Sequence, residues 1–261
     1  MIYITGDTHG NFGRFTKRQR SALPMKLTER DYVIICGDCG ICWADDTEFQ
    51  YNCDWLSRLP FTLLFVDGNH ENHTMLTDYP VELWKGGKVH HIVKDKIIHL
   101  MRGQVFTLEE KKFFTFGGAS SHDMEGGILD REDSLFLEKK KQLKKRKLFY
   151  RVIGETWWKE ELPSQAELEE GRRNLEQIGY QVDYVISHCT SNRVQKLLAQ
   201  NHIKWNSPAK VTQTDILTDY FEELEDKLRY KQWFCGHYHQ DIAIDEKHRV
   251  VYSAILPLKD S

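Results

Sequence analysis

The chain has 261 residues, of which 40% are hydrophobic and 29% are charged, and its formal net charge is −3. This composition is typical of a globular protein with a substantial core, and it excludes a disordered or fibrous chain. The small net charge provides no general attraction to nucleic acid or to anionic membranes. No apolar run approaches the roughly 20 residues that a membrane-spanning helix needs, so no membrane partner is expected.

The chain begins directly with a predicted strand over Ile2–Thr5. A cleavable leader needs a basic segment and an apolar segment before the mature fold, and the sequence leaves no room for either. The sequence therefore predicts a cytoplasmic protein. It gives no indication of the oligomeric state.

A short apolar run followed by a turn rich in Gly, Asp, Asn and His recurs along the chain. Runs of four to six such residues are typical of strands buried on both faces. The predicted strands are Ile2–Thr5, Tyr32–Cys36, Phe61–Val66, Val182–Ser187 and Gln232–Cys235. Helical periodicity alternates with them over Phe49–Arg58, Ser164–Ile178, Ser191–Gln200 and Thr214–Arg229. Ser164 and Glu167 have the spacing of a capping box. This alternation predicts an α/β architecture.

The middle of the chain has a different pattern, in which short strands are separated by tight polar turns. It predicts an antiparallel meander over Lys88–Val93, Lys96–Met101, Gln104–Leu108 and Lys112–Phe116. A final hairpin is predicted over Asp241–Asp245 and Arg249–Ser253. Together these elements predict an α/β (α+β) fold with two packed mixed β-sheets flanked by helices, a four-layer αββα sandwich. We expect a single domain over residues 1–261, because no repeat or linker divides the chain.

Residues from about 120 to 165 are predicted to form a basic and aromatic insertion in this domain. Its most basic part, Glu138–Lys147, is expected to be helical. A lysine-rich helix is usually a solvated surface, which is the favoured interpretation. The alternative is an electropositive lid near an anionic substrate. Trp157 and Trp158 are expected to pack in the core or the lid rather than to stack on nucleobases.

Cys36, Cys39 and Cys42 have the two-residue spacing found in half of a zinc site. However, Cys36 ends a predicted buried strand, and no second pair of Cys or His residues follows at zinc-finger spacing. Small buried thiols are therefore the favoured interpretation, with a structural zinc as the alternative. The six cysteines of the chain do not suggest a disulfide scaffold in a protein of this size.

The turns after the predicted strands supply seven side chains that can bind metal ions. They are Asp7, His9, Asp38, Asn69, His188, His237 and His239. Strand ends are where α/β folds collect their ligand sites. Carboxylate, amide and imidazole groups without thiolate suit borderline divalent ions such as Mn²⁺, Fe²⁺ and Zn²⁺. Seven ligands are too many for one tetrahedral ion, and they suit two ions that share a bridging carboxylate.

Taken singly, most of these motifs have a common alternative explanation. Asp7 would also suit a helix cap, and a lone His188 is more often a structural histidine. The run Gly236-His237-Tyr238-His239 is more specific, because histidines at i and i+2 point the same way and can both reach a metal. The prediction depends on all five motifs occurring in this order at strand ends.

The order of the motifs resembles the calcineurin-like metallophosphoesterases. The matching residues are Asp7-x-His9, Gly37-Asp38, Gly68-Asn69-His70-Glu71, His188 and Gly236-His237-Tyr238-His239. The resemblance extends from residue 3 to about residue 240. The fold of that family, a two-sheet sandwich flanked by helices, agrees with the architecture predicted above. The segment from Glu155 to Glu167, followed by residues 182–188, is similar to a bacterial or phage subgroup.

The resemblance implies a division of the ligands between two metal ions. Asp7, His9, Asp38 and His239 would hold the first ion, and Asp38, Asn69, His188 and His237 would hold the second. Mn²⁺ is the favoured ion, with Fe²⁺ or Fe³⁺, Zn²⁺ and Ni²⁺ as alternatives. Two bridged cations lower the pKa of a shared water, so that hydroxide is available near neutral pH to attack phosphorus.

His70 resembles the general acid of the family, which protonates the leaving oxygen. It follows the predicted ligand Asn69 without being counted as a ligand, and so it is expected beside the reacting phosphate. Asp67 and Glu71 are alternative residues for orienting His70. Asp38 is expected to contribute to catalysis as the bridging ligand.

One motif of the protein phosphatase branch is missing. That branch extends the second motif to Gly-Asp-x-x-Asp-Arg, whereas this chain has neither the second Asp nor the Arg after Asp38. A residue that anchors the phosphate must therefore come from elsewhere. The alternatives considered are Arg131, Arg151, Arg193, His122 and His73.

The sequence thus predicts a metal-dependent phosphoric ester hydrolase with a dinuclear centre, acting on a phosphate mono- or diester. A nucleotide or another small phosphorylated molecule is the expected substrate. A phosphoprotein phosphatase is disfavoured by the missing Asp and Arg. A nuclease is supported by the lysine run and the tryptophan pair, but it is weakened by the net charge. A non-enzymatic scaffold is disfavoured because all seven ligands and His70 are present.

Overall fold

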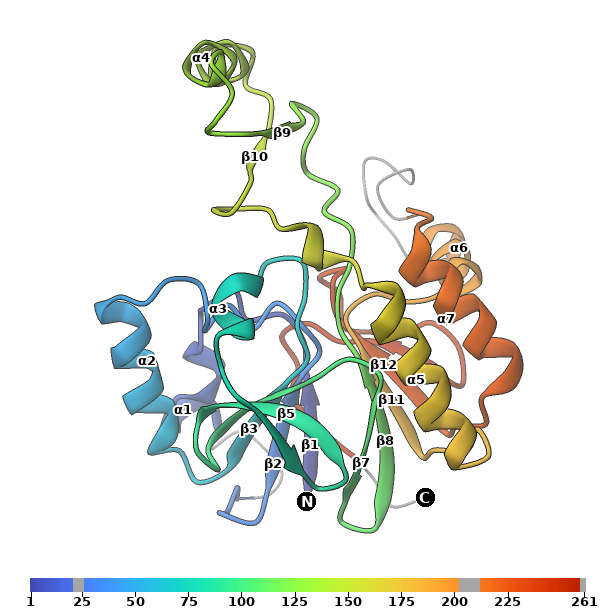
Figure 1. Cartoon of the computed structure of the whole chain (residues 1–261). Helices are drawn as coiled ribbons and strands as arrows, with labels where there is room; N and C mark the ends of the chain where they lie inside the picture. The colour runs from blue at the N-terminus through green and yellow to red at the C-terminus, as the bar shows by residue number, and fades with distance from the viewer. Residues whose placement is uncertain (21–25, 202–211, 259–261) are drawn as a thin grey trace.

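Two mixed β-sheets pack face to face, and helices cover both outer faces (Figure 1). The computed structural model describes residues 1–20, 26–201 and 212–258. Over this part of the chain, the predicted four-layer αββα sandwich is confirmed. None of the helices in these ranges is long and apolar enough to cross a membrane.

The first sheet has the strand order β15-β1-β2-β3-β6-β5-β4. Its strands are β1 (Ile2–Thr5), β2 (Tyr32–Ile35), β3 (Thr62–Phe65), β4 (Val81–Trp84), β5 (Gly87–Val93), β6 (Ile97–Leu100) and β15 (Leu256–Pro257). Strands β1, β2, β3 and β6 are parallel neighbours, and the remaining strands add antiparallel. The carboxyl ends of β1, β2 and β3 therefore lie at the same edge.

The second sheet has the order β13-β14-β12-β11-β8-β7. Its strands are β7 (Gln104–Leu108), β8 (Lys111–Phe116), β11 (Tyr184–Ser187), β12 (Gln232–Cys235), β13 (Ile242–Ala243) and β14 (His248–Val250). The four central strands are parallel, and the two edge strands are antiparallel. The predicted final hairpin corresponds to β13 and β14.

The core is divided into layers by the two-residue period of the strands. In β1, Ile2 and Ile4 lie in the cluster between the two sheets, whereas Tyr3 packs in the cluster beneath the helices. All four residues of β1 are buried. This burial on both faces explains why the central strands are continuous apolar runs rather than alternating ones.

Different helices cover the two outer faces (Figure 1). On the first sheet lie η1 (Gly13–Phe15), α1 (Lys17–Arg20), α2 (Thr47–Ser57) and α3 (His73–Thr77). On the second sheet lie α5 (Gln165–Gln177), α6 (Asn192–Asn201) and α7 (Ile216–Lys227). The four predicted helices correspond to α2, α5, α6 and α7. The predicted capping box at the start of α5 is confirmed, because the Ser164 side chain accepts from the Glu167 amide and Glu167 bonds back.

The predicted meander is wrong in one respect, because it is divided between the two sheets. β5 and β6 pair antiparallel in the first sheet, and β7 and β8 pair antiparallel in the second. The chain crosses from one sheet to the other over residues 101–103, where Arg102 is buried. Strand periodicity predicts neighbouring strands well, but it does not distinguish two sheets that bury similar faces against each other.

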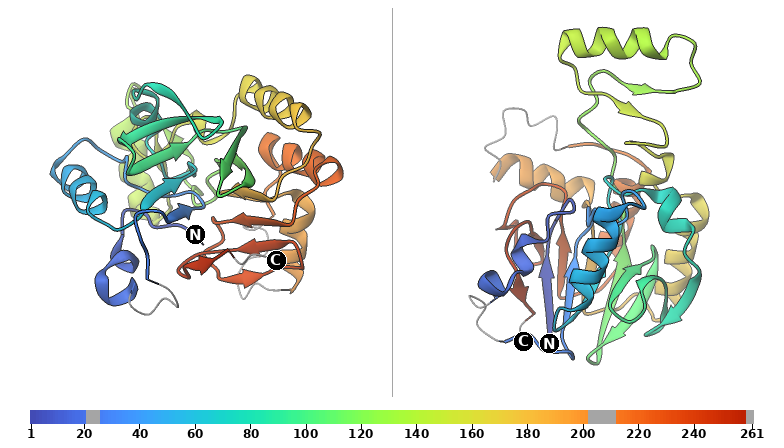
Figure 2. Two further views of the ribbon diagram at one scale, coloured as in Figure 1. Left: turned by 90° about the horizontal axis from the view of Figure 1, so that it is seen from below. Right: turned by 90° about the vertical axis from the view of Figure 1, so that its left-hand side faces the viewer.

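Residues 124–158, which we call the arm, extend away from the sandwich (Figure 1 and Figure 2). The arm contains β9 (Ile128–Leu129), α4 (Phe136–Arg146) and β10 (Arg151–Val152), with β9 and β10 paired in parallel. Its small core consists of Leu129, Phe136 and Val152, with Leu143 and Tyr150 packed against it. The basic segment is helical as predicted. The single-domain organisation of the chain stays a prediction.

Candidate metal centre

The seven predicted ligands follow the carboxyl ends of parallel strands in both sheets. Asp7 and His9 follow β1, Asp38 follows β2, and Asn69 follows β3. In the second sheet, His188 follows β11, and His237 and His239 follow β12. Because parallel strands end at the same edge of a sheet, the packing of the two sheets brings the two sets of turns together.

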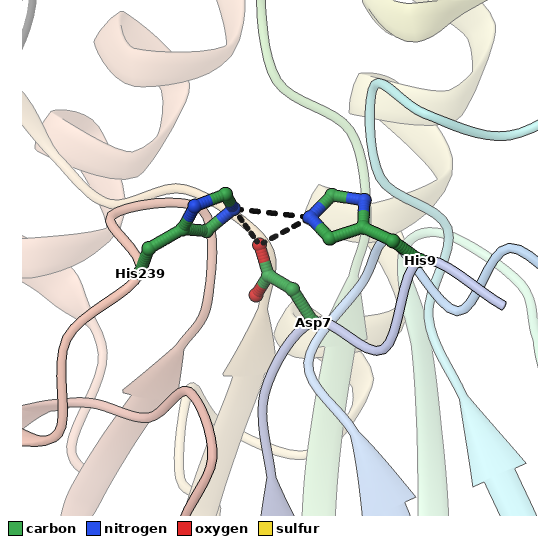
Figure 3. A group of neighbouring side chains, drawn as sticks. All are labelled: Asp7, His9 and His239. Carbon is green, nitrogen blue, oxygen red and sulfur yellow. Dashed lines mark hydrogen bonds and ion pairs between the residues drawn. The ribbon is translucent and has the colours of Figure 1, made fainter. Parts of the chain in front are cut away.

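Asp7, His9 and His239 form the first cluster of ligand atoms (Figure 3). The Nε2 atoms of His9 and His239 are 3.0 Å apart. Asp7 Oδ2 lies 3.2 Å from the His239 nitrogen and 3.9 Å from the His9 nitrogen. Asp7 is buried, whereas both histidines are exposed at the surface. Three ligand atoms within 4.8 Å of one another suit a divalent cation that remains accessible from solvent.

Asp38 and His188 form a second cluster with Asp7. Asp38 Oδ2 lies 3.3 Å from His188 Nε2 and 3.8 Å from His9 Nδ1, which places this oxygen between the two clusters. His188 Nδ1 is 2.8 Å from the carbonyl oxygen of Cys36. Because a carbonyl only accepts, Nδ1 donates to it, and Nε2 is the nitrogen that faces Asp38 and the other ligand atoms.

Asn69 and His237 are the remaining two of the seven predicted ligands. Asn69 Oδ1 lies 3.2 Å from His188 Nε2 and 3.1 Å from His237 Nδ1, so the amide oxygen points into the site. The amide nitrogen of Asn69 donates to Ser121 Oγ over 3.3 Å, and Ser121 Oγ donates to Glu161 over 2.7 Å. Ser121 and Glu161 therefore fix which end of the amide faces the other ligands. The sequence analysis missed both residues, since neither belongs to a recognisable motif.

Several predicted ligands have a left-handed backbone conformation. His9, Asp38, His237 and His239 have φ values of 45°, 49°, 65° and 49°. Residues other than glycine pay a conformational cost of about 1 kcal/mol or more in this left-handed region. Such strain persists where the surrounding structure fixes the backbone, and it gathers at functional sites. Four of the seven predicted ligands are held in this way.

Two motif glycines are explained by the close approach of ligand side chains. A Cβ atom on Gly68 would lie 2.1 Å from Asp38 Oδ1, and one on Gly236 would lie 2.3 Å from Asp7 Oδ1. Any larger residue at these positions would displace a carboxylate of the centre. The glycine that precedes Asn69 and the one that precedes His237 are therefore parts of the site.

The buried charges of the site stabilise one another. Burial alone would raise the pKa of Asp38, but His188 lowers it well below its usual range. Burial lowers the pKa of His188, and Asp38 more than offsets this and raises it to about 10. Burial, with His188 and His122 nearby, lowers the pKa of His237 well below its usual value. The lowered pKa favours the neutral imidazole, the form that binds metals.

His70 lies beside the ligands, as predicted. Its backbone amide donates to Asp38 Oδ1 over 2.7 Å, and its ring centre is 5.3 Å from that of His9. The His70 Nε2 atom lies 3.3 Å from Nη2 of Arg151, which belongs to the arm. Burial lowers the pKa of His70, and Arg151 contributes to the lowering against the opposing effect of Asp38.

Asp67 and Glu71 were the alternatives for orienting His70. The contacts described for these two carboxylates are with residues other than the His70 ring. Asp67 Oδ2 accepts from Nε and Nη2 of Arg102 over 2.9 and 2.5 Å, and Asp67 Oδ1 lies 3.2 Å from His99 Nε2. Burial would raise the pKa of Asp67, but Arg102 holds it far below its usual range. Glu71 Oε1 accepts from the amides of Cys39 and Gly40, and burial raises the Glu71 pKa. These carboxylates brace the turns behind the site.

The five residues considered as phosphate anchors differ in their distance from the metal centre and in their partners. Arg151 reaches His70, and the His122 ring centre is 5.2 Å from that of His237. Arg131 is exposed on the arm and pairs with Glu155. Arg193 is half-exposed and pairs with Glu222 and Asp226. His73 is buried in α3.

The aromatic pair and the cysteines have packing roles. Trp158 is buried and packs edge to face against Trp43, with 5.8 Å between the ring centres. Its Nε1 donates to Thr74 Oγ1 over 3.1 Å. Trp157 Nε1 donates to Glu161 Oε1 over 2.8 Å. These contacts agree with the predicted packing role of the two tryptophans. All six cysteines are buried with free thiols.

The chain is similar to a known protein family and to a solved structure. The model of the family described as calcineurin-like phosphoesterase matches residues 1–241. The crystal structure of phosphopantetheinyl hydrolase (PptH) from Mycobacterium tuberculosis is 16% identical, with a TM-score of 0.43. That alignment covers 96% of this chain and 89% of the hydrolase. A comparison with curated proteins gave no match.

Proposed function

The chain belongs to the calcineurin-like phosphoesterases and is a metal-dependent phosphoric ester hydrolase, and we propose that it uses two divalent cations to hydrolyse a small phosphorylated substrate. The observation that carries the proposal is the convergence of two clusters of ligand atoms from strand ends of both sheets. Each cluster has its atoms within 4.8 Å of one another, and Asp7 belongs to both.

In this proposal, the ligands are divided as the family resemblance implies. Asp7, His9, Asp38 and His239 hold one cation, and Asp38, Asn69, His188 and His237 hold the other. The position of Asp38 Oδ2 between His9 and His188 supports Asp38 as the shared ligand. Mn²⁺ is the favoured cation, with iron, Zn²⁺ and Ni²⁺ as alternatives. When bound, two such cations activate water and neutralise charge on the phosphoryl oxygens.

His70 is the proposed proton donor to the leaving oxygen. Its backbone amide is fixed by Asp38, so the ring is held beside the ligands without occupying a ligand position. The ring is only partly buried, which leaves Nε2 able to meet a substrate. A general acid in such a position contributes typically 10²- to 10⁴-fold to the rate.

A small cavity beside the first cluster supports a small leaving group. It has a volume of about 150 Å³, and its lining combines His9 and the apolar side chains of Ile41, Trp43 and Phe49 with the polar side chains of Asp46, Glu48 and Asn52. Sites for drug-sized ligands are typically about 300 Å³ or larger. A nucleotide or another small phosphorylated molecule stays the proposed substrate class. The cytoplasmic location stays a prediction.

Metal analysis and two model substrates test this proposal. Protein loaded with Mn²⁺ is expected to hold close to two ions per chain and to hydrolyse p-nitrophenyl phosphate or bis-p-nitrophenyl phosphate. The preferred compound distinguishes a monoesterase from a diesterase. Protein that binds no metal and hydrolyses neither compound with Mn²⁺ would contradict the proposal. A panel of nucleotides, phosphopeptides and single-stranded DNA separates the proposed substrate class from a phosphoprotein phosphatase and a nuclease.

The role of His70 has its own test. His70→Ala is expected to retain both metal ions and to lose activity by about 10² to 10⁴ on an alkyl phosphate. The loss should be smaller on a nitrophenyl ester, because nitrophenolate leaves without a proton. His91→Ala, on β5, is the matched control. An equal loss on both esters would argue against a proton donor.

A further inference from the structure

We propose that Arg151, carried by the arm, anchors the phosphate of the substrate at the metal centre. The proposal rests on the proposed phosphoesterase function, and it assigns the cation that the second sequence motif lacks. The arm would then be a part of the active site rather than a surface decoration.

The arm brings Arg151 to the site through the alternation of a strand. Arg151 and Val152 form β10, which pairs with Ile128 and Leu129 of β9. Val152 is buried in the core of the arm. Since successive side chains of a strand point to opposite faces, Arg151 points away from that core. Its side chain is only 11% exposed, and its Nη2 atom lies beside the His70 ring.

The guanidinium of Arg151 has an unused donor. Nη2 pairs with Asp123, which holds the side chain in place. Nε is buried and has no hydrogen-bond partner among the described residues. A buried donor without an acceptor is rare and calls for an explanation. A phosphate oxygen would supply the acceptor, since guanidinium groups bind phosphate with two parallel hydrogen bonds.

Arg151 and His70 are placed to share one phosphate. Nη2 of Arg151 and Nε2 of His70 are 3.3 Å apart, and both are nitrogen atoms that can donate. An oxyanion between the guanidinium and the metal ligands would meet Arg151 on a non-bridging oxygen. The leaving oxygen would face His70.

The base of the arm is attached to the turns that bear the metal ligands. Trp158 packs on Trp43, in the loop after Asp38, and bonds to Thr74 of α3. Glu161, just beyond the arm, bonds to Ser121 and through it to Asn69. These attachments give Arg151 a defined position relative to the centre, which a phosphate anchor requires.

Calorimetric titration of inorganic phosphate, the reaction product, into Mn²⁺-loaded protein tests the proposal. Arg151→Ala and Arg151→Gln are both expected to weaken phosphate binding by about tenfold to a hundredfold, with unchanged metal content. Arg151→Lys should restore part of the affinity, since it keeps the charge but not the planar fork. Arg131→Ala, on the exposed part of the same arm, should bind phosphate as the wild type does.

The outcomes separate this proposal from the proposed function. If the wild type binds two metals and hydrolyses phosphate esters, but Arg151→Gln binds phosphate as tightly as the wild type, the anchor role is overturned and the function stands. Loss of metal from the Arg151 variants would also overturn it, because the residue would then act in metal retention. A wild type without metal or activity would overturn both.

Discussion

The candidate metal centre lies at the strand ends of the two packed sheets, whereas the arm stands outside both sheets on a core of its own (Figure 2). Asp7, Asp38, Asn69 and His188 are each at most 3% exposed. In the arm, by contrast, Leu137 is 77% exposed and Phe149 is 68% exposed. The first region is fixed by the packing of the whole sandwich, and the second by a few contacts at its base.

This difference matches two functions, catalysis and substrate recognition, which need different degrees of structural precision. Reaction chemistry needs ligand atoms held to a fraction of an ångström, which the strand ends of two packed sheets provide. Recognition of a substrate tolerates a separately attached element, provided that its base is anchored. Substitutions in the centre should therefore abolish the reaction, and those in the arm should change binding or have little effect.

Asp38→Asn is expected to have the largest effect on activity. The substitution removes the proposed bridging carboxylate, so hydrolysis should fall by about a thousandfold or more, and the metal content should fall below two ions per chain. Metal analysis and steady-state rates measure the two effects. Asp54→Asn, on the exposed face of α2, is the control. A variant with two ions and a near-normal rate would show that Asp38 is not the shared ligand.

Arg102→Met is expected to be the most destabilising change in the support of the centre. It leaves the buried Asp67 carboxylate without its arginine partner and with His99 beside it, which costs about 3–5 kcal/mol in the free energy of unfolding. It also removes a hydrogen bond to the Glu160 carbonyl, at the base of the arm. Urea unfolding measures the loss.

Arg172→Met breaks the half-exposed pair with Glu223 and is the matched control for Arg102→Met, with an expected loss of at most about 1 kcal/mol. Adding Asp67→Asn to Arg102→Met should recover part of the stability, because no buried charge then remains. Equal effects of the two arginine substitutions would contradict the distinction between buried and exposed pairs.

Glu161→Ala tests the junction between the two regions. The variant loses the acceptor that orients Ser121 and, through it, the Asn69 amide. Supporting groups of this kind typically contribute about 10- to 100-fold to metal affinity, and a loss of that size is expected in Mn²⁺ titrations. Glu160→Ala replaces an exposed neighbour and should bind Mn²⁺ normally. Unchanged affinity in Glu161→Ala would mean that Asn69 is oriented by its other contacts.

Charge reversal on α4 should have the smallest effect. Lys141, Lys144 and Lys145 are exposed, and exposed charges are screened by salt over about 10 Å. The triple substitution to Glu is expected to change hydrolysis of a small ester by no more than about twofold. A large loss confined to single-stranded DNA as substrate would instead support the electropositive lid and a nuclease. Steady-state rates at two salt concentrations distinguish these results.

The sequence by itself determined the elements that bear the site. Each predicted ligand lies directly after a strand with a strong apolar pattern, so local periodicity placed it at a strand end. The capping box of Ser164 and Glu167 is likewise a local interaction, three residues apart. Patterns of this range can be recognised from the sequence because the interacting groups are neighbours along the chain.

Only the tertiary structure decided which distant residues support those ligands. Arg151 was one of five alternatives from the sequence, and its contact with His70 spans 81 residues. Ser121 reaches Asn69 across 52 residues, and Arg102 reaches Asp67 across 35. The division of the predicted meander between two sheets was also decided only by the tertiary structure. Such contacts depend on how sheets pack and where the arm is attached, and no local pattern of residues encodes either.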